Sequence, residues 1–81
     1  MAQNDLPEAL FHAQQAYAFA EDQKQKDGLT FSLLTLGDIY LAQKEAEQAR
    51  ANFEQALALA QELQLAYGIS KASERLKDLA K

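Results

Sequence analysis

Few side chains in this sequence have the chemistry that metal binding or catalysis requires. The chain has 81 residues, with one histidine, His12, and no cysteine. Metal sites built on imidazole or thiolate ligands combine several such groups, so a lone histidine does not indicate one. In a helix, His12 is typical of a surface position rather than of a catalytic one. We therefore predict no metal, no cofactor and no catalytic residue.

The carboxylates and hydroxyls are also badly placed for acid–base or nucleophilic chemistry. Glu21–Asp22 and the pair Glu45 and Glu47 are near neighbours in the sequence. Helical side chains one or two positions apart point in different directions, so these carboxylates indicate solvated faces. The serines that could act as nucleophiles have no base nearby in the sequence, and only the fold can bring one close: Ser32, Ser70 and Ser73. With no Gly-rich phosphate loop or nucleophile elbow, the sequence predicts that the chain is not an enzyme.

Composition and charge favour one small soluble domain that covers residues 1–81. The formal charge of −4 argues against nucleic-acid binding, which needs concentrated Lys and Arg. No apolar run approaches the roughly 20 residues of a membrane-spanning helix. The first residues lack the basic start and apolar core of a signal peptide. We expect a cytoplasmic protein that contacts neither nucleic acid nor membrane.

The elements that position these side chains are predicted to be helices. One proline and three glycines in a chain rich in Ala, Leu, Gln and Glu indicate an all-α fold. Asp5 is a candidate N-cap for the first helix. The apolar stripe of that helix has the spacing of a single helical face: Leu6, Leu10, Ala13, Tyr17 and Ala20. The same periodicity predicts four helices: 6–23, 29–43, 45–63 and 67–80.

The sequence repeats itself at a spacing of 40 residues, which is typical of stacked helical units. Positions in the first half recur as identical residues in the second: Ala16, Ala20 and Gly28 as Ala56, Ala60 and Gly68. Gly28 and Gly68 either end the preceding helices as C′ residues or lie in the first turn of the next helix. The sequence leaves both alternatives open.

Small and large residues alternate between the second and third predicted helices in a pattern that predicts close packing. Without a side chain, Gly37 lets the second helix approach the third, and the ring of Phe53 fills the space between two alanines. The full pattern is Leu33, Leu36, Gly37 and Tyr40 on the second helix and Ala49, Phe53 and Ala56 on the third.

This spacing resembles the tetratricopeptide signature. Residues 30–63 look like one full repeat, 6–23 like the second half of an upstream repeat, and 67–80 like the first half of a downstream one. The 40-residue spacing is similar to that in kinesin light chains, Leu-Gly-Asn adaptor proteins and bacterial regulatory proteins. The resemblance implies antiparallel helix-turn-helix repeats, with four helices in a short right-handed superhelical stack.

The sequence departs from this pattern at three places. Leu33 stands where the family often has an aromatic residue, and Lys44 lies in a turn that often contains glycine. Ala13 occupies the position that matches Phe53 one repeat later. Packing around the first helix must therefore differ, with Phe11 or Tyr17 as the candidates to fill the gap.

The resemblance implies a protein–protein interaction module that binds a peptide or a helical segment of a partner protein. In this family the first helix of each pair lines a concave groove, and here that face would present Phe31, Leu34, Thr35, Asp38 and Leu41. Such an apolar groove edged by one acid suits an amphipathic helix or an extended apolar peptide. The alternative is that Phe31, Leu34 and Leu41 are each buried in the fold or in a homodimer.

The two ends of the chain differ in polarity. The last helix is predicted to be a C-terminal cap, because it carries polar residues outside its apolar stripe: Lys71, Glu74, Lys77, Asp78 and Lys81. The first helix instead offers Leu10, Phe11 and Phe19 as a candidate oligomer interface. The second functional hypothesis is therefore a self-associating structural domain, a homodimer formed through the N-terminal helix.

Overall fold

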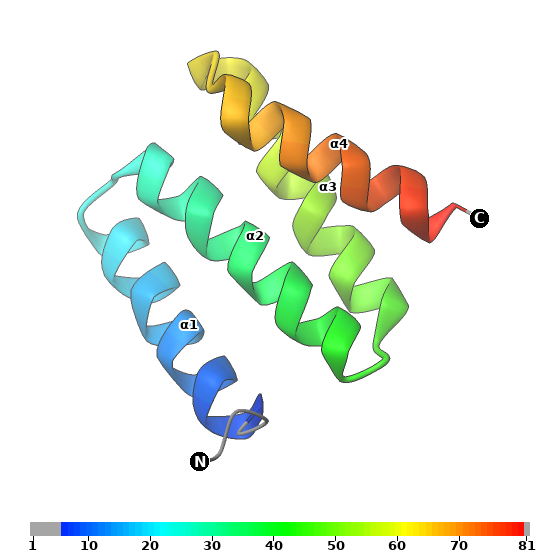
Figure 1. The fold of residues 1–81 in the computed structure, drawn as a ribbon. Helices are drawn as coiled ribbons and strands as arrows, with labels where there is room; N and C mark the ends of the chain where they lie inside the picture. Colours follow the sequence, from blue (N-terminus) through cyan, green and yellow to red (C-terminus); the bar gives the residue numbers. More distant parts are fainter. Residues whose placement is uncertain (1–5, 81) are drawn as a thin grey trace.

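The computed structural model describes residues 6–80, which form four α-helices (Figure 1). In chain order these are α1 (Leu6–Asp22), α2 (Lys26–Ala42), α3 (Ala46–Leu63) and α4 (Ala66–Leu79). The expected all-α fold is confirmed, and α2 begins three residues earlier than the sequence pattern suggested. Asp5 and Lys81 lie outside the described residues.

Each helix packs antiparallel to the helix before it, so that consecutive helices form hairpins (Figure 1). The central helix is α2, which contacts α1 on one side and α3 on the other. The last helix, α4, packs on α3 and also reaches α2. This arrangement places α2 and α4 beside each other on one face of the molecule.

The three connections between the helices are copies of one turn at 20-residue intervals. A residue with positive φ follows each of the first three helices: Lys24 at 56°, Lys44 at 64° and Gln64 at 58°. The next amide N–H donates to the carbonyl oxygen five residues back at 2.8 Å: Gln25 to Ala20, Glu45 to Tyr40 and Leu65 to Ala60. This is the Schellman pattern, which glycine usually completes. Lys44 therefore adopts the left-handed conformation that glycine has in related turns.

Gly28 and Gly68 lie in the first turns of α2 and α4, so neither of them ends the preceding helix. A Cβ atom on Gly68 would stand 2.9 Å from Cβ of Ala60, and one on Gly28 would stand 3.2 Å from Cβ of Ala20. Both glycines thus permit close approach to the helix before them. The second of the two sequence alternatives is the correct one.

The core between α2 and α3 is built on the contact predicted from the sequence. Phe53 is fully buried, and a Cβ on Gly37 would meet its ring at 2.5 Å. Ala49 and Ala56, also fully buried, lie in the same cluster. Because no side chain separates the backbone of α2 from this ring, the two helices pack tightly at Gly37.

A smaller cluster joins α1 to α2. Ala13 is buried there with Leu36 and Ile39. Tyr17 packs against both this cluster and the larger one, whereas Phe11 is 55% exposed. Tyr17 is therefore the residue that compensates for the small side chain of Ala13.

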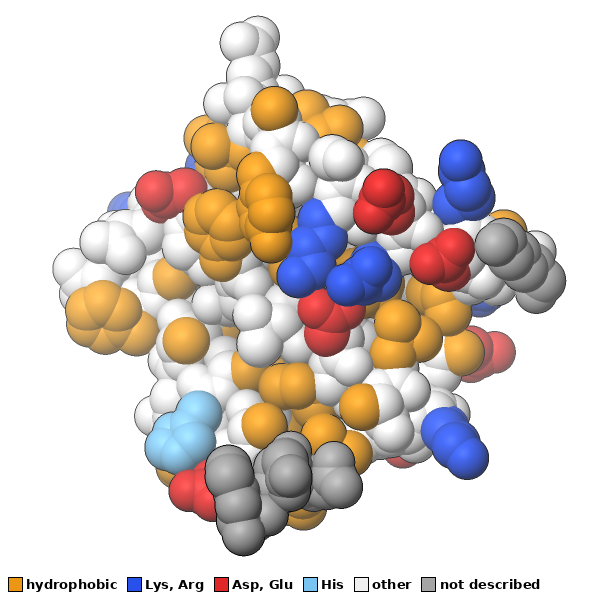
Figure 2. Space-filling model, in the orientation of Figure 1, with side chains coloured by type: hydrophobic (Ala, Val, Ile, Leu, Met, Phe, Trp, Pro, Cys, Tyr) orange, Lys and Arg blue, Asp and Glu red, His pale blue; other side chains and the backbone are white. Residues whose placement is uncertain are grey.

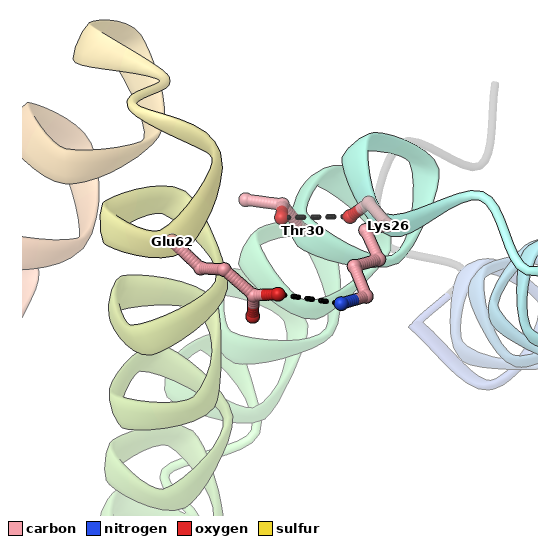
Figure 3. Close-up of polar contacts among 3 residues, drawn as sticks. All are labelled: Lys26, Thr30 and Glu62. Carbon is pink, nitrogen blue, oxygen red and sulfur yellow. Dashed lines mark hydrogen bonds and ion pairs between the residues drawn. The ribbon is translucent and has the colours of Figure 1, made fainter.

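Polar contacts connect the start of α2 to the end of α3 (Figure 3). Lys26, the first residue of α2, forms an ion pair with Glu62 in the last turn of α3. Thr30 is fully buried, and its hydroxyl donates to the carbonyl oxygen of Lys26 at 2.9 Å. The buried hydroxyl thus has an acceptor within its own helix.

Candidate partner-binding face

The residues predicted to line a groove on α2 have different environments in the structure. Leu34 is only 2% exposed and belongs to the main core cluster with Phe53, so the prediction that it contacts a partner is wrong. Leu41 is half-buried and packs against the same cluster. For Leu34 the alternative of burial within the fold is therefore correct. Phe31 and Thr35 are exposed, and Asp38 is partly exposed.

An aromatic pair spans α2 and α4 on this face. Phe31 is 46% exposed, and the centroid of its ring lies 5.9 Å from that of Tyr67, with 37° between the ring planes. Tyr67 is 60% exposed. Two large aromatic rings that pack on each other and still face solvent form an apolar platform at one end of the face.

A charge cluster lies on the same face, also between α2 and α4. Asp38 accepts a hydrogen bond at 2.9 Å from Nε of Arg75, and its other carboxylate oxygen is 3.3 Å from Nζ of Lys71. The hydrogen bond to Asp38 and the negative charge of that carboxylate raise the pKa of the Arg75 guanidinium above its ordinary value. Figure 2 shows two basic side chains over an acidic one near the centre of this face, beside hydrophobic side chains. Asp38 is thus an internal partner of two cations and not an isolated acid.

A shallow pocket of about 280 Å³ runs along α4 from Tyr67, one member of the aromatic pair, to Arg75, one member of the charge cluster. Its lining comes from α4: Tyr67, Ser70, Lys71, Glu74 and Arg75. Nζ of Lys71 lies 5.9 Å from the centroid of the Tyr67 ring, which is within the range of a cation–π contact. The pocket therefore offers an aromatic wall, a hydroxyl, two cationic donors and the carboxylate of Glu74.

The sequence reasoning missed the contribution of α4 and assigned its polar residues to a solvated cap. The 40-residue repeat contained the missing signal. Shifting the five residues expected to line the groove on α2 by one repeat gives Lys71, Glu74, Arg75, Asp78 and Lys81, of which Lys81 lies outside the described residues. Three of the four described positions line the pocket. The face is therefore mixed in character, apolar at the aromatic pair and charged beyond it, and not the apolar groove edged by one acid that we predicted.

A second hollow of about 450 Å³ lies at the end of the helix stack where the first and third turns meet. It is lined by Lys24, Gln25, Lys26, Asp27, Leu63 and Leu65. It has no aromatic wall, and Lys26 is already paired with Glu62. Compared with this hollow, the α2–α4 face offers a ligand both aromatic and charged contacts.

The residues predicted as an oligomer interface on α1 divide into two kinds. Leu10 is half-buried and packs against the cluster of Ala13, Leu36 and Ile39, so it serves the internal contact with α2. Phe11 and Phe19 are 55% and 63% exposed. The aromatic residues alone remain available on the outer surface of α1.

The described part of the chain contains no cluster of three or more side chains suited to hold a metal ion. None of the helices formed by residues 6–80 has the length and apolar character needed to cross a membrane. His12 lies on the exposed side of α1, where its Nε2 is 3.6 Å from a carboxylate oxygen of Glu8, one helical turn earlier.

No protein-family model matches this chain, and comparisons with curated proteins and with solved structures find no match.

Proposed function

We propose that this chain is a protein-interaction module with a tetratricopeptide-like stack of helices. Three features support the proposal: the 40-residue repeat, the Gly37–Phe53 contact between α2 and α3, and the turn that recurs between successive helices. The handedness implied by the resemblance, a right-handed superhelix, is part of the same proposal. Such stacks expose the first helix of each pair on one side, which here corresponds to α2 and α4.

In this proposal, the partner binds across the α2–α4 face. The observation that carries it is the exposed Phe31–Tyr67 pair next to the ordered cluster of Asp38, Lys71 and Arg75. Aromatic and arginine side chains are the residue types that dominate binding energy at interfaces. Because Asp38 already holds both cations in place, a partner does not have to order them on binding.

The chemistry of the face selects the partner segment. An apolar side chain would pack on the aromatic pair, and hydrogen-bond acceptors would meet Lys71 and Arg75. Phe31 lies on α2 and Tyr67, Lys71 and Arg75 lie on α4, so the segment lies along both helices and contacts each of them. We therefore propose a short peptide or one turn or more of an amphipathic helix, with one apolar anchor followed by polar acceptors.

Selection of peptides from a random library, followed by titration of the selected peptides, tests this function. Phe31→Ala and Tyr67→Ala should each weaken binding by about tenfold or more, the loss typical of an anchor residue. Gln55→Ala, an exposed change on α3, serves as the matched control and should leave the affinity unchanged. Circular dichroism would verify that each variant is folded. Equal affinity in all variants would refute the proposed face.

A further inference from the structure

A second surface, on α1, is left without a neighbouring helix. Among the described residues, α1 packs against α2 and against no other helix. Beside its buried stripe, α1 exposes His12, Ala16 and Phe19, which follow the i, i+4, i+7 spacing of one helical face. Phe19 is 63% exposed, so this face presents a large aromatic ring to solvent.

The internal repeat indicates what kind of neighbour this face can accept. Ala16 and Phe19 correspond to Ala56 and Leu59 on α3, forty residues later. Ala56 is fully buried, and Leu59 packs against the main core cluster formed by α2, α3 and α4. The chain thus covers this face with a neighbouring helix in one copy of the repeat and leaves it open in the other. The exposed face of α1 is therefore suited to pack against a helix.

The other end of the stack cannot provide that helix from a second copy of the chain. On α2, the residues that pack toward α3 include Leu33 and Gly37. The matching positions on α4 are Ser73 and Lys77, and both are exposed. A head-to-tail assembly would press these polar side chains against Ala16 and Phe19 and desolvate them without an apolar partner.

The charge of α1 also opposes its association with itself. Glu21 and Asp22 lie in its last turn, and there is no Lys or Arg between Leu6 and Asp22. The carbonyl end of the helix adds further negative potential there. An antiparallel pair of α1 helices centred on Gln15 would pack Phe11 on Phe19 and bring Glu8 opposite Asp22, once on each side. Like charges at these positions weaken such a dimer.

We infer that this face binds a basic amphipathic helix from another protein. The apolar stripe of that helix covers Ala16 and Phe19, as the main core cluster covers Ala56 and Leu59. Lys or Arg side chains on its flank pair with Asp22, which lies three positions after Phe19 at the acidic end of α1. The site is separate from the α2–α4 face, so the domain can hold two different segments.

Two synthetic amphipathic peptides with the same leucine stripe, one with lysine and one with glutamate at the polar positions, test this inference. The full chain should bind the lysine peptide, and Phe19→Ser should weaken that binding by about tenfold or more. The variant Asp22→Lys should shift the preference toward the glutamate peptide. Tyr67→Ala, on the other face, should have no effect, which separates this site from the proposed groove.

Three results would overturn the inference: no binding of the lysine peptide, equal binding of both peptides, or binding that Phe19→Ser leaves unchanged. Sedimentation gives an independent check. A dimer of the wild-type chain that dissociates in the Phe19→Ser variant would make a second copy the occupant instead. Because Phe19 is mostly exposed, its replacement should leave the fold intact, and circular dichroism would verify this.

Discussion

The contact between Gly37 and Phe53 permits a quantitative test of the packing of α2 on α3. A Cβ at position 37 would stand 2.5, 2.6 and 2.9 Å from three atoms of the Phe53 ring, whereas ordinary contacts begin near 3.4 Å. The ring would have to retreat by about 0.9 Å, the difference between 3.4 and 2.5 Å. Phe53 is fully buried, so it cannot turn toward solvent to make that room.

Two opposing effects determine how Gly37→Ala changes the free energy of unfolding. Overpacking a well-packed core costs about 1–3 kcal/mol. Alanine gains up to about 1 kcal/mol over glycine in a helix interior. Because the clash involves three ring atoms, the cost of overpacking should exceed the gain in helix propensity. We expect the free energy of unfolding to fall by about 1–2 kcal/mol. This loss is a large part of the total free energy of unfolding, which is about 4–12 kcal/mol for a chain of this length. Urea unfolding followed by circular dichroism measures it.

A double-mutant cycle with Phe53→Leu isolates the clash. Leucine lacks the two ring atoms, Cε1 and Cζ, that a Cβ at position 37 would meet at the shortest distances. In the Phe53→Leu chain, Gly37→Ala should raise the stability. The difference between its effects in the two chains gives a coupling energy of about 1–3 kcal/mol between the two sites. Gly28→Ala is the matched control, because its Cβ would meet only Cβ of Ala20 within 3.4 Å. If Gly37→Ala raises the stability of the wild-type chain, the reasoning about the close approach of α2 and α3 is wrong.

Two further predictions concern the turns and the charge cluster. Lys44→Gly should raise the melting temperature by about 4–8 °C, because glycine removes about 1 kcal/mol of left-handed strain. Lys44→Val should lower the melting temperature. A thermal scan in which the valine variant melts at the higher temperature would contradict the turn geometry. Asp38→Asn should lower the free energy of unfolding by about 1 kcal/mol at low salt, because two ion pairs lose their shared acid. In 1 M salt the difference should shrink, since screening already weakens the pairs in the wild-type chain. A difference that stays constant with salt would show that packing, not charge, is lost.

The sequence predicted the helices and their tightest contacts because small residues at helical spacing carry that information directly. The spacing of Gly37 and Phe53 predicted the packing of α2 on α3, and the structure confirms it. The 40-residue spacing marked Gly28 and Gly68 as equivalent, although their position in the first turn of a helix needed the structure.

The sequence could not assign a direction to every apolar residue of α2. This helix contacts α1, α3 and α4, so apolar side chains lie on most of its circumference. Periodicity cannot separate an apolar residue that faces a third helix from one that faces a groove. Leu34 illustrates the difficulty, since it packs in the core while Phe31, three positions earlier, remains exposed.

The Lys44 turn shows a different kind of limit. The absence of glycine suggested a departure from the usual connection between helices, yet the same hydrogen bonds form at all three turns. A left-handed residue costs about 1–2 kcal/mol, which the packing of the two helices it connects readily offsets. The missing glycine at Lys44 therefore indicates a strained turn, and not a turn with a different hydrogen-bond pattern.

The repeat also shows why the candidate face has a direction. Equivalent positions on its two helices have different chemistry: Phe31 and Thr35 on α2 correspond to Lys71 and Arg75 on α4. The aromatic pair and the charge cluster nevertheless each span both helices, so a partner that runs along α2 and α4, from the aromatic pair toward Asp38 and Arg75, passes from an aromatic surface to a charged one within a single segment. Reversing the order of apolar and acceptor groups in that segment would place the acceptors on the rings and the apolar side chain on the charges. Specificity should thus depend on the order of residues in the bound segment as much as on their identity.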